Sequence, residues 1–108
     1  RGMAVDATIA DDSGREWDMG TPFDYLTTDP AHNPAARDFS VLPASVLENR
    51  RRLTAAMQDA AAREGRDLLP LPAEWWDFRF PASYYNTFAP LSDADLPPEM
   101  RMTAGQAV

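Results

Sequence analysis

The longest regular pattern of hydrophobic residues in this sequence lies between residues 45 and 64 and predicts an α-helix. It opens with Ser45-Val46-Leu47-Glu48, a capping-box pattern in which Ser45 accepts from a free amide and Glu48 reaches back. Gly65 follows as a stop signal. We expect the hydrophobic stripe of this helix to pack on a sheet. The residues expected to be buried are Val46, Leu53, Met57 and Ala60, and those expected to face solvent are Glu48, Arg52 and Arg63.

Shorter segments on either side have the pattern of β-strands. Residues 3–9 (MAVDATI) alternate, which puts Asp6 on the face opposite Val5. Residues 10–15 are turn formers typical of a hairpin, and residues 16–24 return in an extended conformation. Residues 74–80 (EWWDFRF) are rich in aromatic side chains and predict a buried strand. Residues 25–43 are loop-like, so the fold class expected is α+β, with a small, mostly antiparallel sheet and one main helix.

The last part of the chain lacks this periodicity. Residues 90–108 are polar and contain proline and methionine without a helical or strand pattern. We therefore divide the chain into a folded part, residues 1–89, and a loosely attached tail, residues 90–108.

Composition narrows the classes of partner. The chain has 108 residues, which suffices for one domain, and a net charge of −7, which disfavours nucleic acid as a partner. It has no cysteine, and no hydrophobic run reaches the length of a membrane span, so we expect no membrane partner. Because the chain begins with arginine, we expect its true N-terminus to lie elsewhere, and both bacterial cytoplasm and periplasm stay open.

Four acidic residues are candidates for chemistry: Asp6, Asp24, Glu74 and Asp77. Glu74 precedes two tryptophans, whose burial would desolvate its carboxylate, raise its pKa and suit it to proton transfer. The alternative interpretation is an aromatic core strand flanked by ordinary solvated acids. Composition alone does not show that these carboxylates converge.

A resemblance to a known family supplies that step. Residues 1–6 (RGMAVD) resemble the second half of the Ser-x-His-x-x-Gly-x-Ala-x-Asp motif of the D-alanyl-D-alanine dipeptidase family of zinc peptidases. Residues 19–24 (MGTPFD) resemble its Met-Gly-x-x-Phe-Asp segment, and residues 49–53 (NRRRL) its Asn-Arg-Arg-x-Leu helix. Residues 74–77 (EWWD) resemble its Glu-Trp-Trp-His segment. The resemblance covers residues 1 to about 88 and identifies the chain as the C-terminal part of such a domain.

The resemblance implies roles for the four acids. Asp6 would be a zinc ligand, Glu74 the general base that activates a water molecule, and Asp24 a partner of the substrate's ammonium group. Asp77 stands where the family has a histidine ligand, and we expect it to bind the metal through oxygen. The family's first histidine ligand and its transition-state arginine both lie upstream of Arg1. The metal site would lie on the face of the sheet away from the helix.

These implications give a hypothesis and two alternatives. The hypothesis is zinc-dependent hydrolysis of D-Ala-D-Ala or a related cell-wall dipeptide, with part of the site supplied by a segment or chain outside these residues. The 108 residues alone are expected to be inactive. One alternative is a non-catalytic relative that serves as a binding or regulatory domain, which the aspartate at position 77 favours; the other is an active two-part site. Residues three apart on a regular strand face opposite sides, so Glu74 and Asp77 can share a site only if the chain bends near Trp75.

Overall fold

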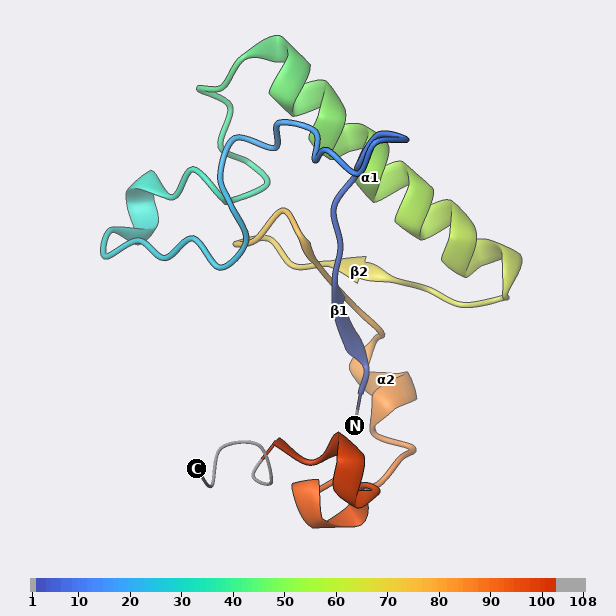
Figure 1. The fold of residues 1–108 in the computed structure, drawn as a ribbon. Helices are drawn as coiled ribbons and strands as arrows, with labels where there is room; N and C mark the ends of the chain where they lie inside the picture. Colours follow the sequence, from blue (N-terminus) through green and yellow to red (C-terminus); the bar gives the residue numbers. More distant parts are fainter. Residues whose placement is uncertain (1, 103–108) are drawn as a thin grey trace.

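The computed structural model describes residues 2–102, and their fold is α+β, as predicted (Figure 1). A long helix crosses above a small sheet, and the C-terminal segment, residues 90–102, lies at the bottom of the view, below the N-terminal end of the first strand. The strands are β1 (Ala4–Asp6), β2 (Leu69–Pro70) and β3 (Asp77–Arg79), and the helices are α1 (Ala44–Arg63) and α2 (Ala82–Tyr85). Short 3-10 helices occupy Pro30–His32, Asp93–Asp95 and Pro98–Met100.

The sheet is antiparallel throughout its described strands, in the order β1-β3-β2. Val5 is paired with Phe78 and Asp6 with Asp77. Because side chains alternate along a strand, the two aspartates share one face and Val5 and Phe78 share the other. Phe78 is fully buried in a core that includes Leu53 of α1. The aspartates therefore lie on the face of the sheet away from the helix.

The strands are shorter than the sequence pattern predicts. β1 ends at Asp6, although its neighbour Ala7 still donates to the carbonyl of Trp76 at 2.9 Å. β3 begins only at Asp77, so the strand predicted from residue 74 is wrong in its first half. There the chain turns, which allows Trp75 and Trp76 both to enter the core, with exposed fractions of 2% and 1%. Strand geometry would have sent these neighbouring indoles to opposite faces.

The predicted hairpin turn at residues 10–15 is present. Ala10 and Glu16 form an antiparallel bridge, and the side chain of Asp11 accepts hydrogen bonds from the backbone of Ser13 and Arg15. Gly14 closes the turn with a φ of 83°, a left-handed conformation that glycine adopts without a steric penalty.

Helix α1 lies within one residue of its predicted bounds, but its first turn is built differently. The N-cap is Pro43, which makes no side-chain capping bond, so the predicted capping box at Ser45 is wrong. Glu48 instead accepts hydrogen bonds from Arg51 and Arg52 along the helix surface. The predicted stop is correct: Gly65 has a φ of 67° and donates to the carbonyl of Ala62.

The burial along α1 follows the prediction only in the first half of the helix. Val46 and Leu53 are buried, and Met57 is partly buried against the core. The prediction for Ala60 is wrong, because it is exposed at the rim of a groove of about 320 Å³. Val5 and Phe78 of the sheet line the same groove, so the sheet faces this end of the helix without covering Ala60. Of the residues expected in solvent, Arg52 and Arg63 are exposed, whereas Glu48 is half-buried.

Arg50 is buried on the inner side of α1, with 7% of its surface exposed. Its guanidinium donates to the carbonyls of Met19 at 2.8 Å, Pro34 at 2.7 Å and Ala36 at 3.3 Å. The approach needs Gly20, where a Cβ atom would come within 3.1 Å of this guanidinium. One helix side chain thus ties the segment around residue 19 and the loop at 34–36 to the helix. The core that these loops close contains Met19, Ala35, Leu53, Trp75, Trp76 and Phe78.

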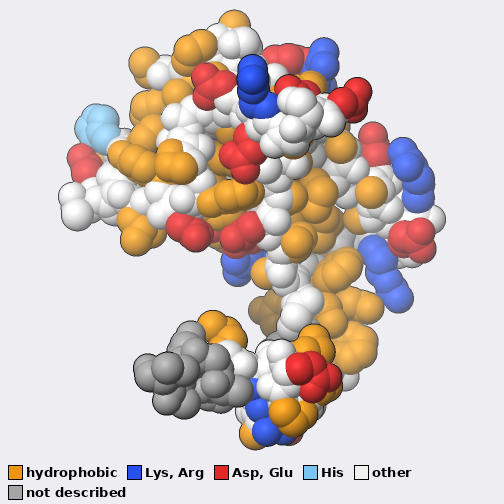
Figure 2. All heavy atoms as spheres, in the orientation of Figure 1, with side chains coloured by type: hydrophobic (Ala, Val, Ile, Leu, Met, Phe, Trp, Pro, Cys, Tyr) orange, Lys and Arg blue, Asp and Glu red, His pale blue; other side chains and the backbone are white. Residues whose placement is uncertain are grey.

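The C-terminal segment is ordered by local hydrogen bonds. Asp95 accepts from the backbone of Ser92, and Arg101 donates to the carbonyls of Leu96 and Ala94. Figures 1 and 2 show this segment beside the rest of the molecule and joined to it by a narrow neck. Residues 103–108 of the predicted tail lie outside the described residues, and its loose attachment stays a prediction. Within residues 2–102 no helix is long and apolar enough to span a membrane.

The packing of Leu53 gives a test of this core. Replacing Leu53 by alanine should lower the free energy of unfolding by roughly 2–5 kcal/mol, because the site is closed by Trp75, Phe78 and their neighbours. Ala60→Ser, on the exposed part of the same helix, should change it by about 0.5 kcal/mol or less. Urea unfolding of both variants measures the difference. Equal effects would show that the helix is docked in another orientation.

Candidate functional site

Asp6 and Asp77 face each other across β1 and β3. Hydrogen bonds from Phe80 to Met3 and from Ala7 to Trp76 mark the bonded pairs of this ladder. Bonded and non-bonded pairs alternate in an antiparallel sheet, so Asp6–Asp77 is a non-bonded pair, in which Cα atoms are about 4.5 Å apart and side chains are closest. The sheet therefore brings two carboxylates together on one face.

Glu74 reaches this region because the chain bends between Leu71 and Asp77. The amide of Glu74 donates to the carbonyl of Leu71, and the amide of Asp77 donates to the carbonyl of Glu74 at 3.4 Å. Arg37 closes the bend, since its guanidinium donates to the carbonyls of Leu71 and Asp77, both at 2.7 Å. The bend near Trp75 that a site shared by Glu74 and Asp77 would require is therefore present.

Asp24 is placed by the aromatic core. The preceding residue, Phe23, stacks on Trp75 with ring centroids 5.5 Å apart and lies edge-on to Trp76 at 6.1 Å. Asp24 itself has a φ of 57°, the one positive value among the described non-glycine residues. Aspartate tolerates this left-handed conformation better than most residues do.

The charges of these acids act on one another. Burial raises the pKa of Glu74, and the charges of Asp77, Asp6 and Asp24 raise it further. Burial likewise raises the pKa of Asp6, with Asp77 and Asp24 adding to the effect. We call these four residues the acidic cluster. Its members lie close enough for their charges to interact, whereas their arrangement around one common cleft stays a prediction.

Arg79 is the cation that opposes this accumulation of charge. It lies two residues after Asp77 on the same strand face and lowers the pKa of both Asp6 and Glu74. Its Nε donates to Asp77 Oδ1 at 3.1 Å and its terminal nitrogen to Oδ2 at 2.8 Å. The side chain of Asp77 is 10% exposed. Sequence analysis missed this pair, although an acid and an arginine two residues apart on a strand are a recognisable signal.

The acidic cluster does not form a complete zinc centre by itself. Zinc sites use at least three protein ligands, and residues 2–102 contain no group of three or more His, Cys, Asp or Glu side chains that could hold a metal ion. Asp6 offers a carboxylate with no ion pair among the described residues, but both oxygens of Asp77 accept hydrogen bonds from Arg79. The carboxylates of Asp6 and Asp77 therefore fit part of a metal site and do not complete one.

Comparison with known proteins identifies the family. A family model described as D-ala-D-ala dipeptidase matches residues 1–92. The chain belongs to the D-Ala-D-Ala dipeptidase family. It is 33% identical over 86 residues to the D-alanyl-D-alanine dipeptidase of Escherichia coli (strain K12), an alignment that covers 78% of this chain. The same alignment covers 39% of that relative, so the chain spans about two fifths of its length.

Membership in the dipeptidase family confirms the resemblance found in the sequence and supports a peptidase-like enzyme. Peptidases of this family are generally metal-dependent. The structure places the sequence-predicted residues Asp6, Glu74 and Asp77 at the β1–β3 pair and the adjoining bend. Their individual roles in binding and catalysis stay predictions.

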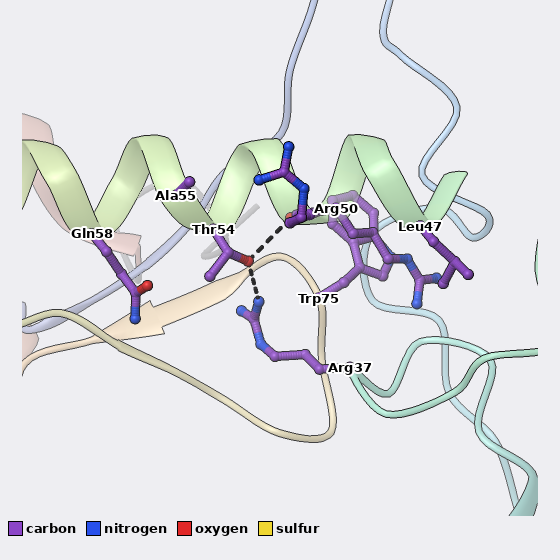
Figure 3. Close-up of a pocket in the computed structure, with 8 residues that line it drawn as sticks. Arg37, Leu47, Arg50, Thr54, Ala55, Gln58 and Trp75 are labelled. Carbon is purple, nitrogen blue, oxygen red and sulfur yellow. Dashed lines mark hydrogen bonds between the residues drawn. The ribbon is translucent and has the colours of Figure 1, made fainter. Parts of the chain in front are cut away.

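A second polar region of this dipeptidase-family chain lies under α1. A hollow of about 400 Å³ is bordered by Arg37, Arg50 and Trp75 together with residues of the helix (Figure 3). Figure 3 shows Arg37 reaching Thr54 of the helix, a hydrogen bond of 2.9 Å. None of the acidic cluster lines this hollow. Because the donors of Arg37 and Arg50 are directed at carbonyls of the chain, we assign both arginines to holding loops in place.

The raised pKa values predict how acidity acts on this chain. The pKa of Glu74 lies above its ordinary value of 4.5, so the folded state binds more protons than the unfolded state just above that pH. The free energy of unfolding contributed by this group therefore falls as pH rises through that window. Asp6→Asn should lower the pKa of Glu74, because it removes one of the charges that raise it.

Carbon-detected NMR titration of the Glu74 carboxyl measures this shift. Asp11 is the internal control, since its pKa is lowered by hydrogen bonds from Ser13 and Arg15 and should not respond to Asp6→Asn. An unchanged Glu74 titration would show that Asp6 and Glu74 are too far apart to belong to one cluster.

Proposed function

We propose that this chain supplies the acidic part of the active centre of a zinc-dependent peptidase that hydrolyses D-Ala-D-Ala or a related cell-wall dipeptide. The observation that carries the proposal is the pairing of Asp6 with Asp77 on the sheet face away from α1, set by the β1–β3 register. The charges of Asp24 and Glu74 act on the same region, which supports their part in the proposal. Family membership supports the reaction class. The remaining groups of the centre come from a segment or chain outside these 108 residues.

Glu74 is the general base of this proposal. It is half-buried beside Trp75, and its raised pKa makes its carboxylate a better proton acceptor than a solvated glutamate. Glu74 would take a proton from the attacking water molecule and return it to the amine that leaves when the peptide bond breaks. The bend at residues 74–77 lets it do so next to the face that carries Asp6.

Asp24 would bind the free ammonium group of the dipeptide. A dipeptide substrate has one ammonium and one carboxylate, and a carboxylate on the protein distinguishes the first from the second. The stacking of Phe23 on Trp75 fixes the chain just before Asp24, which favours a constant position for its charge. This contact would set which end of the dipeptide enters the centre.

Asp6 is the carboxylate that this chain offers most directly to zinc. The carboxylate oxygens of Asp77 could also bind zinc, but they are available only when the ion pair between Asp77 and Arg79 opens. Zinc, when bound by such a centre, supplies Lewis acidity and lowers the pKa of a coordinated water molecule. Two carboxylates do not complete the site, and the proposal therefore requires further ligands from outside the described residues.

The outer edge of β1 is a place where such an outside segment could pair. β1 is an edge strand, and the backbone groups of Ala4 and Asp6 point away from β3, because the intervening residue Val5 makes the ladder bonds. Such an edge can pair with an added strand. A segment paired there would lie beside the Asp6 carboxylate.

A non-catalytic relative is the second candidate function. The observation that favours it is the ion pair between Asp77 and Arg79, which engages both oxygens of a residue at a ligand position of the motif. A domain of this kind would keep the acidic face for binding a cationic or dipeptide ligand without turnover. The two candidates differ in one result, the release of D-alanine.

A D-alanine release assay tests the proposed function. We expect the 108-residue chain to show no detectable turnover of D-Ala-D-Ala, and a longer chain that carries an upstream Ser-x-His segment to be active. Glu74→Gln in the longer chain should remove turnover while zinc stays bound, because the water molecule loses its base. Calorimetric titration of zinc provides the binding measurement.

Asp11→Asn is the matched control, since Asp11 is an exposed acid in the hairpin turn and should leave turnover unchanged. Full activity in the Glu74→Gln protein would contradict the role of Glu74. A longer chain that binds zinc and D-Ala-D-Ala without releasing D-alanine would favour the non-catalytic relative.

A further inference from the structure

We propose that Arg79 withholds Asp77 from metal binding, so that position 77 contributes a fixed ion pair where the motif that it resembles has a metal ligand. The inference deepens the proposed function and rests on it, because it concerns the same acidic cluster. The two carboxylates that face each other across β1 and β3 would then have different roles. Asp6 stays available to a cation, and Asp77 does not.

The geometry of the pair carries this inference. Arg79 engages Asp77 through two separate nitrogens and both carboxylate oxygens, at 3.1 and 2.8 Å. Bidentate pairs of this kind are among the stronger hydrogen-bonded contacts in proteins. With the pair formed, the side chain of Asp77 is 10% exposed and that of Arg79 is 44% exposed, so the carboxylate is largely covered while the guanidinium reaches solvent. A metal ion arriving at Asp77 would meet a guanidinium already bound to the same oxygens, and two positive charges would compete for one carboxylate.

The neighbouring charge explains why this strand needs the arginine. Asp6 and Asp77 are directly opposite in a non-bonded pair, where side chains lie closest. Two like charges in that position destabilise a sheet. Arg79 lies on the same face and offsets the repulsion between the two aspartates. The ion pair is thus a structural part of the sheet.

A different role for Arg79 makes the opposite prediction. An arginine can also orient a carboxylate that binds a metal, in the way that outer hydrogen-bond partners hold metal ligands. In that case the removal of Arg79 would weaken metal binding by about 10- to 100-fold. In our proposal its removal frees Asp77 and strengthens metal binding.

The experiment is a calorimetric zinc titration of the 108-residue chain and three variants: Arg79→Gln, Asp77→Asn and the double variant. We expect Arg79→Gln to bind zinc roughly tenfold more tightly or better, because a second carboxylate becomes available next to Asp6. Asp77→Asn should bind zinc as the parent chain does, since Asp77 is not a ligand there. The double variant, which has the parent's net charge, should return to the parent's affinity.

Arg63→Gln is the matched control for charge, because it removes an exposed arginine of α1 from the same chain. It should leave zinc affinity nearly unchanged. A second readout is Tm: Arg79→Gln should lower Tm without zinc, because the two aspartates then repel each other, and added zinc should restore much of the loss. Asp77→Asn should be less affected by zinc in the same assay.

The outcomes decide between the two roles. Weaker zinc binding by Asp77→Asn, or unchanged or weaker binding by Arg79→Gln, would overturn the proposal. If Arg79→Gln does not fold, the Asp77→Asn titration alone decides, because a ligand cannot be removed without loss of affinity. These titrations use no dipeptide, so they can fail while D-alanine release by the longer chain succeeds, and the reverse.

Discussion

The guanidinium of Arg37 binds both ends of the bend that carries Glu74. It donates to the carbonyls of Leu71 and Asp77 and to the hydroxyl of Thr54 on α1, and it lies 4.7 Å from the ring centroid of Phe78. Burial lowers its pKa to about 10, which still leaves the group charged at neutral pH. If the bend opened, several donors of a half-buried cation would lose their partners, at a cost well above that of one surface hydrogen bond. The position of the acidic cluster depends on this contact.

The sheet is small, which explains why arginine side chains are needed to hold the loops in place. β1 and β3 have three residues each and β2 has two, so the ladder by itself can fix little of the chain. Arg50 does for the loop at 34–36 what Arg37 does for the bend at 71–77, by donating to carbonyls that have no strand partner. Both guanidinium groups also lie near aromatic rings of the core, Arg37 over Phe78 and Arg50 at 6.0 Å from the ring of Trp75. Helix α1 therefore organises loops through directed hydrogen bonds as much as through hydrophobic packing.

The sequence could predict those features that are set by local chemistry. Helix α1 lies within one residue of its predicted bounds, Gly65 ends it, and the hairpin turn at 10–15 forms around Asp11 and Gly14. The α+β class followed from the separation of helical and strand patterns. The family was recognisable from four short motifs, and their order was needed before the acids could be expected to converge. Hydrophobic spacing alone gave no reason to bring Asp6 near Glu74.

Features set by tertiary contacts could not be predicted from the sequence. Trp75 and Trp76 favour a strand locally, yet the chain turns so that both indoles are buried, and the Nε1 of Trp75 finds the hydroxyl of Thr21 at 2.8 Å. Arg50 interrupts the hydrophobic stripe of α1 in the sequence, but it is buried because loop carbonyls surround it. Ala60 fits the stripe and is exposed at the rim of a groove, although Val5 and Phe78 of the sheet line the same groove. For the tryptophans and for Arg50, partners distant in sequence outweigh the local preference.

Asp6 belongs both to the edge strand of the sheet and to the acidic cluster. Its backbone groups lie on the free edge of β1, and its carboxylate faces Asp77 within the cluster. A polypeptide segment that paired with this edge would extend the sheet and place its own side chains next to the Asp6 carboxylate. A second copy of the chain would bring another Asp6 and another excess of negative charge to the same edge, which like-charge repulsion disfavours. The edge is therefore matched to a segment with neutral or cationic side chains, the same kind of group that an incomplete acidic centre lacks.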